Sequence, residues 1–150
     1  MGWVEDLRGQ VVGVDTAPII YLIEESATYL DSVRRFFAAV DAGDIQAVTS
    51  TVTLLEVSVQ PIRRGDVGLA RRYRDILLNS PGMSCQAVSS DIAEEAARLR
   101  AVYNLRTPDA IQLATAIRSG ASHFLTNDSF LPPIPLMQIL ILDQLVPLPP

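Results

Sequence analysis

The chain contains 150 residues, of which 49% are hydrophobic, so it can bury the core of one folded domain. It has 17 acidic and 12 basic residues, and every basic residue is an arginine; the absence of lysine excludes a Walker A phosphate loop and Schiff-base chemistry. The single cysteine and single histidine exclude an intramolecular disulfide, a structural zinc site of cysteine and histidine, and a two-histidine acid–base mechanism.

Short apolar runs alternate with longer segments of helical period along the chain. In chain order we first predict a strand at 10–15, helices at 18–24 and 27–42, and a strand at 45–50. A helix through Val52, Leu55 and Val59 should stop before Pro61, and a polar break follows at 63–65. The remaining elements are a helix at 66–79, a strand at 83–88, helices at 91–103 and 107–119, and strands at 123–126 and 136–142. The helix at 107–119 has the clearest ends, because Thr107 can act as its N-cap, Pro108 suits its first turn and Gly120 can close it.

This order of elements predicts an α/β fold, with a central and mainly parallel β-sheet flanked by α-helices on both faces. Near-continuous apolar strands are typical of sheets that are covered on both sides. We expect a single domain over 1–150, with its core at about 11–142 and a proline-rich C-terminal tail at 143–150. The segments 131–135 and 147–150 should be extended and irregular, because six of the ten prolines lie from Pro132 onward.

The N-terminus lacks the basic start and apolar run of a signal peptide. The longest apolar run, 134–142, is interrupted by Pro135 and Gln138 and is far shorter than the roughly 20 residues that span a bilayer. We therefore expect a soluble, cytoplasmic protein without membrane contact.

Four acidic residues occupy equivalent places, just after a predicted strand or in the first turns of the helix that follows it: Asp15, Glu56, Asp109 and Asp128. In an open parallel sheet, the junctions between strands and helices gather at the carboxyl ends of the strands. The four carboxylates are therefore expected to converge there.

Each acid alone also has a purely structural explanation. Asp15 and Asp128 can cap helices, and Asp109 can complement the dipole of its helix. Glu56 stands three residues after Thr53, which is the spacing of a capping box. The apolar neighbours of Glu56, Asp109 and Asp15 nevertheless favour partly desolvated carboxylates, whose pKa values rise unless a cation neutralises them.

A divalent cation is the simplest neutralising group for such a cluster. Ligation by oxygen alone favours Mg²⁺, with Mn²⁺ as a plausible substitute, over Zn²⁺. Such an ion can activate water and bind a phosphate, as in nucleases and phosphatases. Thr126 or Asn127 could support the ion with a neutral oxygen or orient its water, although Thr126 could equally bond to backbone.

Four segments together resemble the motifs of a PIN domain. They are VVGVDT at 11–16 with IIYL at 19–22, VTSTVTLLEV at 48–57, RTPDAIQLATA at 106–116, and FLTND at 124–128. The resemblance covers about 11–142, and the size is similar to that of VapC-type toxins of bacterial toxin–antitoxin modules. The chain departs from the family pattern at Gln112, where relatives often have histidine, and after Asp128, where the usual acid is missing.

The resemblance implies a PIN fold and a Mg²⁺-dependent ribonuclease. Asp15, Glu56, Asp109 and Asp128 would be both its catalytic residues and its metal ligands, with Thr126 as the supporting hydroxyl. The expected reaction is in-line attack of metal-activated water on an RNA phosphodiester, which leaves a 3′-hydroxyl and a 5′-phosphate. The resemblance further implies a homodimer and a cognate antitoxin that blocks the acidic site.

A net charge of −5 argues against nucleic-acid binding, since phosphate contacts normally come from a basic surface. Setting aside the four candidate ligands leaves 13 of the 17 acids against 12 arginines, which is close to neutral. The densest basic stretch lies in a predicted loop and in the helix after it, and consists of Arg63, Arg64, Arg71, Arg72 and Arg74. It can contact RNA or an acidic partner, or it can simply be a solvated face.

Two other functions remain compatible with these residues. One is a PIN nuclease of RNA processing or DNA repair that has no antitoxin. The other is a catalytically inactive PIN-like binding module whose acids only cap helices. A phosphatase of the haloacid dehalogenase type is disfavoured, because the residues after Asp15 lack its second aspartate and the chain has no lysine.

Overall fold

Five parallel strands form the centre of the molecule. The structure is a computed structural model, and it describes residues 2–146. The strands are β1 (Val11–Val14), β2 (Gln46–Ser50), β3 (Met83–Gln86), β4 (His123–Thr126) and β5 (Gln138–Ile141), and they lie side by side in the order β3-β2-β1-β4-β5. The predicted α/β fold with a parallel sheet is thereby confirmed.

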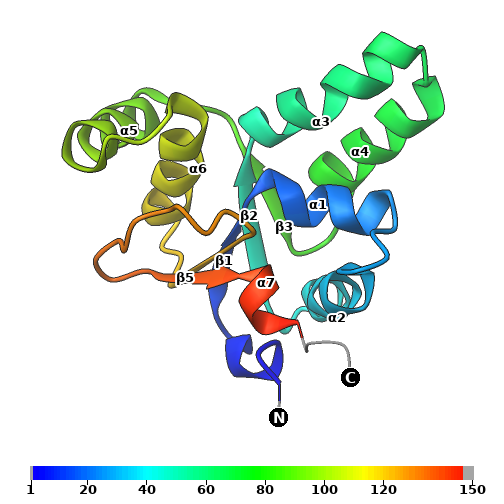
Figure 1. The fold of residues 1–150 in the computed structure, drawn as a ribbon, viewed down its shortest axis with the longest axis horizontal. Helices are drawn as coiled ribbons and strands as arrows, with labels where there is room; N and C mark the ends of the chain where they lie inside the picture. The colour runs from blue at the N-terminus through cyan, green and yellow to red at the C-terminus, as the bar shows by residue number, and fades with distance from the viewer. Residues whose placement is uncertain (1, 147–150) are drawn as a thin grey trace.

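Helices cover both faces of this sheet (Figure 1). One side is packed by α1 (Thr16–Ile23), α2 (Leu30–Asp41), α3 (Thr51–Arg64), α4 (Val67–Asn79) and the short α7 (Leu142–Leu145). The other side is packed by α5 (Ser90–Tyr103) and α6 (Thr107–Arg118), and a 3₁₀ turn at Glu5–Leu7 precedes the sheet. Within residues 2–146, no helix has both the length and the apolar character needed to cross a bilayer.

The central strand β1 is apolar because it is covered on both faces. Val12 and Val14 are completely buried in the core that includes α1 and α2. Gly13 faces α6, and a Cβ atom at this position would lie 2.5 Å from Cβ of Ala116 and 2.9 Å from the ring of Phe124. The missing side chain therefore allows α6 to approach the sheet closely, and α6 carries one of the four acids.

The helix α3 was predicted to stop before Pro61, and this prediction is wrong. The helix continues to Arg64 and ends at Gly65, whose φ of 67° is the left-handed conformation that glycine adopts readily. Pro61 removes one backbone donor in the last turns, but its ring is buried against the core. Arg63 and Arg64 therefore lie in a helical turn, where their charge complements the helix dipole, and not in the predicted break.

Several other predicted boundaries are also wrong by a few residues. The helix α2 begins at Leu30 and not at 27, and β3 ends at Gln86 and not at 88. The last strand begins at Gln138, because Leu136 lies in a turn with φ of 63°. The expected tail at 143–150 begins within α7, and its residues 147–150 lie outside the described part of the chain.

Candidate functional site

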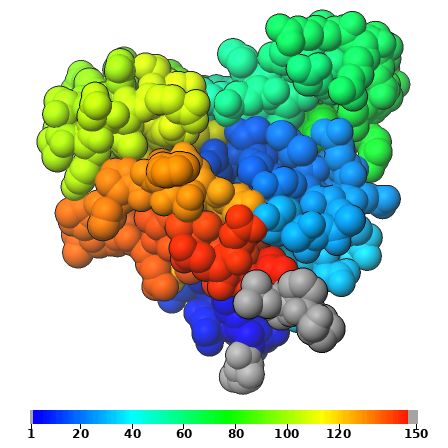
Figure 2. All heavy atoms as spheres, in the orientation of Figure 1, coloured from blue at the N-terminus to red at the C-terminus, as the bar shows by residue number. Residues whose placement is uncertain are grey.

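Three of the four acids follow the carboxyl ends of β1, β2 and β4, whereas the fourth, Asp109, begins a helix that follows another helix, α5. Asp15 directly follows β1, Glu56 lies in the second turn of α3, Asp109 lies in the first turn of α6, and Asp128 follows β4 by two residues. In the space-filling view the pair α3–α4 stands apart from the pair α5–α6, and a hollow opens between them above α1 (Figure 2). A pocket of about 600 Å³ between β2, β3 and the end of α6 contains none of the four acids.

Asp15 is held by two hydrogen bonds. Its Oδ1 accepts the backbone N–H of Thr16 at 2.8 Å, so Asp15 is the N-cap of α1, and its Oδ2 accepts the hydroxyl of Thr126 at 2.8 Å. Burial raises the pKa of Asp15, the two hydrogen bonds oppose this shift, and the nearby charges of Asp109 and Glu56 raise the pKa further. Capping and membership of an acidic cluster are thus both true of Asp15.

Glu56 reaches the cluster through Thr16, the residue next to Asp15. The Thr16 hydroxyl donates to Oε1 of Glu56 at 2.7 Å, and the Glu56 side chain is exposed. The capping-box explanation for Glu56 is wrong, because the N-cap of α3 is Ser50, three residues before Thr53. Glu56 therefore lies too far inside α3 to form a capping box, and its side chain reaches Thr16 at the start of α1.

A buried chain of polar side chains supports Thr16 from below. The Ser50 hydroxyl donates to Oε1 of Gln112 at 2.8 Å, which orients the amide, and Nε2 of Gln112 donates to Thr53 and, at 3.4 Å, to Thr16. Thr53 is also within 2.7 Å of the Thr49 hydroxyl. Because Thr16 accepts from Gln112, its own proton is available for Glu56.

Asp109 forms an ion pair with the exposed Arg106. Nε of Arg106 lies 3.0 Å from Oδ2 of Asp109, whose side chain is only 15% exposed. The hydrogen bond and charge of Asp109 raise the pKa of Arg106, and the charges of Asp128 and Glu56 add to this effect. Arg106 is the N-cap of α6, so the prediction that Thr107 caps this helix is wrong.

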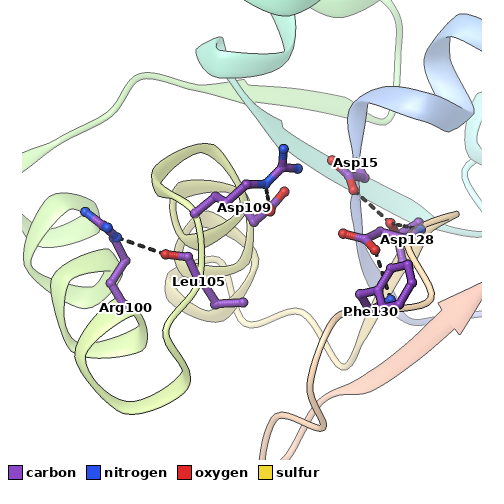
Figure 3. A network of polar contacts seen from close by, with 8 residues as sticks. Asp15, Arg100, Leu105, Asp109, Asp128 and Phe130 are labelled. Carbon is purple, nitrogen blue, oxygen red and sulfur yellow. Dashed lines mark hydrogen bonds and ion pairs between the residues drawn. The ribbon is translucent and has the colours of Figure 1, made fainter.

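Asp128 is tied to Asp15 through Thr126. The backbone N–H of Asp128 donates to the Thr126 hydroxyl at 3.0 Å, and Oδ1 of Asp128 accepts the N–H of Phe130 at 2.9 Å. A turn follows Asp128, so this residue caps no helix. Figure 3 shows Asp15, Asp109 and Asp128 turned toward a common space from three different elements.

Asn127, which was predicted to support the site, is turned elsewhere. Its amide nitrogen donates to the Tyr21 hydroxyl at 3.0 Å, and its amide oxygen accepts the N–H of Asp143 at 2.9 Å. The five exposed arginines of the basic stretch lie in the last turn of α3 and along α4. Of these, Arg64 lines a small pocket together with Glu56 and Glu24, and Nη2 of Arg72 donates to the Ile23 carbonyl at 3.3 Å.

The acids have the right donor chemistry for a hard divalent cation, because carboxylate oxygens are the preferred ligands of Mg²⁺ and Mn²⁺. The raised pKa of Asp15 also marks a carboxylate that a cation would stabilise. Among residues 2–146, however, no three acid, histidine or cysteine side chains form a closed group that could hold an ion. Each acid is instead bonded to its own neighbour: Thr126 and Thr16 for Asp15, Thr16 for Glu56, Arg106 for Asp109, and Phe130 for Asp128.

Three residues that orient the acids were not predicted to do so: Arg106, Thr16 and Gln112. A weak signal for Gln112 exists, because it is a polar residue one turn after Asp109 on an otherwise apolar face of α6, and it is only 3% exposed. Thr16 and Arg106 give no such signal, because polar residues beside helix N-termini are common.

The PIN domain family matches residues 12–132 of the chain. The chain therefore belongs to the PIN domain family, whose members are nucleases that generally use a divalent metal. At the sequence level, no curated protein matches the chain significantly.

Solved structures of toxin–antitoxin proteins share this fold. A chain of VapBC2 from Rickettsia felis, bound to a DNA fragment from its promoter, has a TM-score of 0.65 at 16% identity, with 86% of this chain and 96% of that chain covered. A toxin–antitoxin complex from Klebsiella pneumoniae has a TM-score of 0.63 at 28% identity, with coverage of 85% and 94%. VapC20 from Mycobacterium tuberculosis, described as a toxin that cleaves the sarcin–ricin loop, has a TM-score of 0.61 at 20% identity, with coverage of 76% and 86%.

Proposed function

We propose that the protein is a Mg²⁺-dependent endoribonuclease and the toxin of a toxin–antitoxin pair. The observation that carries this proposal is the convergence of Asp15, Glu56, Asp109 and Asp128 at one edge of a PIN-family sheet, where the pKa of Asp15 is raised by burial and by two of the other acids. A carboxylate cluster of this kind is destabilising unless a cation binds to it.

In this proposal the four acids are the metal ligands and the catalytic residues. A divalent ion bound by them supplies an activated water and neutralises charge on the phosphate. Thr126 holds Asp15 in place, because its hydroxyl donates to Oδ2, and the Thr16 hydroxyl holds Glu56 in the same way. The open hollow of Figure 2 suits a polymer that passes across the site better than a small molecule enclosed in a pocket.

RNA is the proposed substrate, and the support comes from a structural relative and from the charge distribution. The fold is shared with a toxin that cleaves the sarcin–ricin loop, which is an RNA target. Arg106 lies at the acids and carries free guanidinium nitrogens, and Arg64 shares a pocket with Glu56. These two residues can contact phosphates, whereas Arg63, Arg71, Arg72 and Arg74 lie on the outer helices and can contact RNA or an acidic partner.

The proposed partners are a cognate antitoxin and a second copy of this chain. The relative from Klebsiella pneumoniae, at 28% identity, was solved as a toxin–antitoxin complex. Exposed apolar side chains at Leu55, Val59 and Ile62 follow one another along α3 at helical spacing. Such a stripe on a soluble domain is typical of a surface that another protein covers.

The test is cleavage of total cellular RNA by the purified protein, with the new 5′ ends mapped. Samples with Mg²⁺ or Mn²⁺ are compared with a sample in excess chelator and with the Asp109→Asn variant. We expect discrete cuts that disappear with chelator and with the variant. Absence of cutting together with absence of a metal-induced thermal shift would refute the nuclease and leave a binding module.

Growth assays separate the toxin from a PIN nuclease without an antitoxin. A toxin should arrest growth when it is expressed alone, and co-expression of a small upstream reading frame should restore growth. The Asp109→Asn variant should be harmless in both cases. RNA cleavage without growth arrest would instead indicate a role in RNA processing or repair.

A further inference from the structure

Phe130 is an exposed aromatic residue next to the acids. Its side chain is 93% exposed, and Figure 3 shows the ring beside the carboxylate of Asp128. Leu136, in the same loop before β5, is also fully exposed, but within residues 2–146 it forms no hydrogen bond to the acids. Single exposed apolar residues are common on protein surfaces, so the position of Phe130 matters more than its exposure.

The backbone of Phe130 is connected to Asp15 by three successive hydrogen bonds. The N–H of Phe130 donates to Asp128 at 2.9 Å, the N–H of Asp128 donates to Thr126 at 3.0 Å, and the Thr126 hydroxyl donates to Asp15 at 2.8 Å. Thr126 is completely buried, so this series of hydrogen bonds starts inside the core. The aromatic ring therefore has a fixed anchor point relative to the acids.

An acidic site benefits from a source of RNA affinity in addition to positive charge. The net charge is −5, and the charge of Arg106, the arginine beside the acids, is partly neutralised by its ion pair with Asp109. An aromatic face binds any unstacked base without requiring charge, and each stacked base contributes about 1–3 kcal/mol. A base that is paired and stacked within a duplex cannot present its face to a protein in this way.

We propose that Phe130 is a stacking platform for an unpaired base beside the bond that is cut. This inference rests on the proposed ribonuclease function. The ring is expected to contact RNA and not a protein partner, because Phe130 adjoins Asp128. An RNA strand whose phosphate lies at the acids would place a neighbouring base next to this ring. The stacking contribution is also independent of salt, unlike phosphate contacts.

The experiment measures binding of labelled RNA by fluorescence anisotropy in Ca²⁺, at two salt concentrations. The three probes are an eight-residue oligoadenylate, an RNA duplex without unpaired residues, and an eight-residue abasic ribose-phosphate chain. Wild type is compared with Phe130→Ala, with Phe130→Trp, and with Leu136→Ala as the matched control. Both positions are exposed, so none of these variants should unfold the protein, and a thermal melt of each verifies this.

We expect Phe130→Ala to bind oligoadenylate roughly five- to 150-fold more weakly than wild type, by a factor that does not change with salt. Binding of the abasic chain and of the duplex should not change. Phe130→Trp should retain the affinity, and its introduced indole should be quenched by oligoadenylate, whereas Leu136→Ala should behave as wild type.

The proposal is overturned if Phe130→Ala binds oligoadenylate as wild type does, or if it loses the abasic chain equally. It is also overturned if the variant changes only the oligomeric state, measured by light scattering, because the ring would then belong to a protein interface. If wild type neither binds these probes nor cuts RNA with Mg²⁺, both the stacking inference and the proposed function fail. If wild type cuts RNA and Phe130→Ala is unaffected, only the stacking inference fails.

Discussion

Replacing Asp15 with asparagine should stabilise the metal-free protein. The amide can still accept the N–H of Thr16, and asparagine caps helices about as well as aspartate. The loss of negative charge at the start of α1 costs about 0.3–1 kcal/mol, and the hydrogen bond with Thr126 must reverse, because the amide nitrogen that replaces Oδ2 donates to the hydroxyl oxygen. Against this, the change removes a buried charge and its repulsion from Asp109 and Glu56, which are the causes of its raised pKa.

The two opposing effects differ enough to predict a direction. We expect a net gain of about 1 kcal/mol in the free energy of unfolding, which has the usual size of a single-substitution effect but the opposite sign to most. For a chain of this size, a gain of 1 kcal/mol corresponds to a rise in Tm of roughly 2–4 °C. Divalent metal should reverse the order, because an ion present at 100 times its Kd would stabilise the wild type by about 2.7 kcal/mol and Asp15→Asn lacks one of the proposed ligands.

The pH dependence of the free energy of unfolding provides a second test of the same variant. Because the pKa of Asp15 is higher in the folded protein than its ordinary value of 3.8, the folded state holds more protons between these two values. This contribution to stability is present at low pH and is lost as the pH rises through the folded pKa. Asp15→Asn should remove that part of the pH dependence in the absence of metal.

The assay is thermal unfolding in chelator and in saturating Mg²⁺, with Asp66→Asn as the matched control. Asp66 is also an N-cap, because its Oδ1 accepts the N–H of Leu69 at 3.0 Å, but it is exposed on α4 and is not one of the four acids. The control should change little and identically in both conditions. If Asp15→Asn is less stable than wild type in chelator, or shifts in parallel with Asp66→Asn, the reasoning about the acidic cluster is refuted.

The other predictions concern the residues around the acids and the packing beneath them. Arg106→Gln should bind Mg²⁺ about two- to fivefold more tightly by titration calorimetry, because a competing cation of Asp109 is removed; unchanged or weaker binding would contradict this. Gln112→Leu should lose about 1–3 kcal/mol in urea unfolding, because buried hydroxyls lose their partner; a neutral result would mean that they find other partners. Gly13→Ala should lower the free energy of unfolding by about 1–3 kcal/mol, because the added methyl group overpacks against α6. The control Gly68→Ala, in the exposed helix α4, should raise the free energy of unfolding by about 0.5–1 kcal/mol. Equal effects of the two substitutions would contradict the packing argument.

The parallel strands and the backbone positions of the acids follow from local patterns in the sequence, whereas the order of the strands in the sheet does not. An aspartate directly after an apolar strand, as at Asp15, stays at the carboxyl end of that strand in any parallel sheet, so its position depends only on the strand being identified. Asp109 is similar, because Pro108 identifies the first turn of α6. Helix ends were less predictable: Pro61 was read as a stop, but burial of its ring in the core outweighs the loss of one hydrogen bond.

The partners of each acid depend on tertiary packing and could not be predicted. Asn127 and Asp128 are adjacent, yet the side-chain amide of Asn127 donates to the Tyr21 hydroxyl, whereas the backbone N–H of Asp128 donates to Thr126. Gln112 orients Thr16 across 96 residues of sequence, through a hydrogen bond that exists only when α6 packs against the start of α1. Local sequence patterns specify where a backbone lies, whereas the direction of a polar side chain depends on which donors surround it.

The nature of these donors explains how the acidic cluster can exist without metal. Asp15 and Glu56 are held by threonine hydroxyls and a backbone N–H, which stabilise a carboxylate while adding no positive charge. Arg106 neutralises only one of the four acids, Asp109, and its side chain is 79% exposed, so it can leave at little cost. The folded protein therefore positions its carboxylates while it retains the excess negative charge that a divalent cation requires, and Arg106 would be released to contact phosphate when such an ion displaces it.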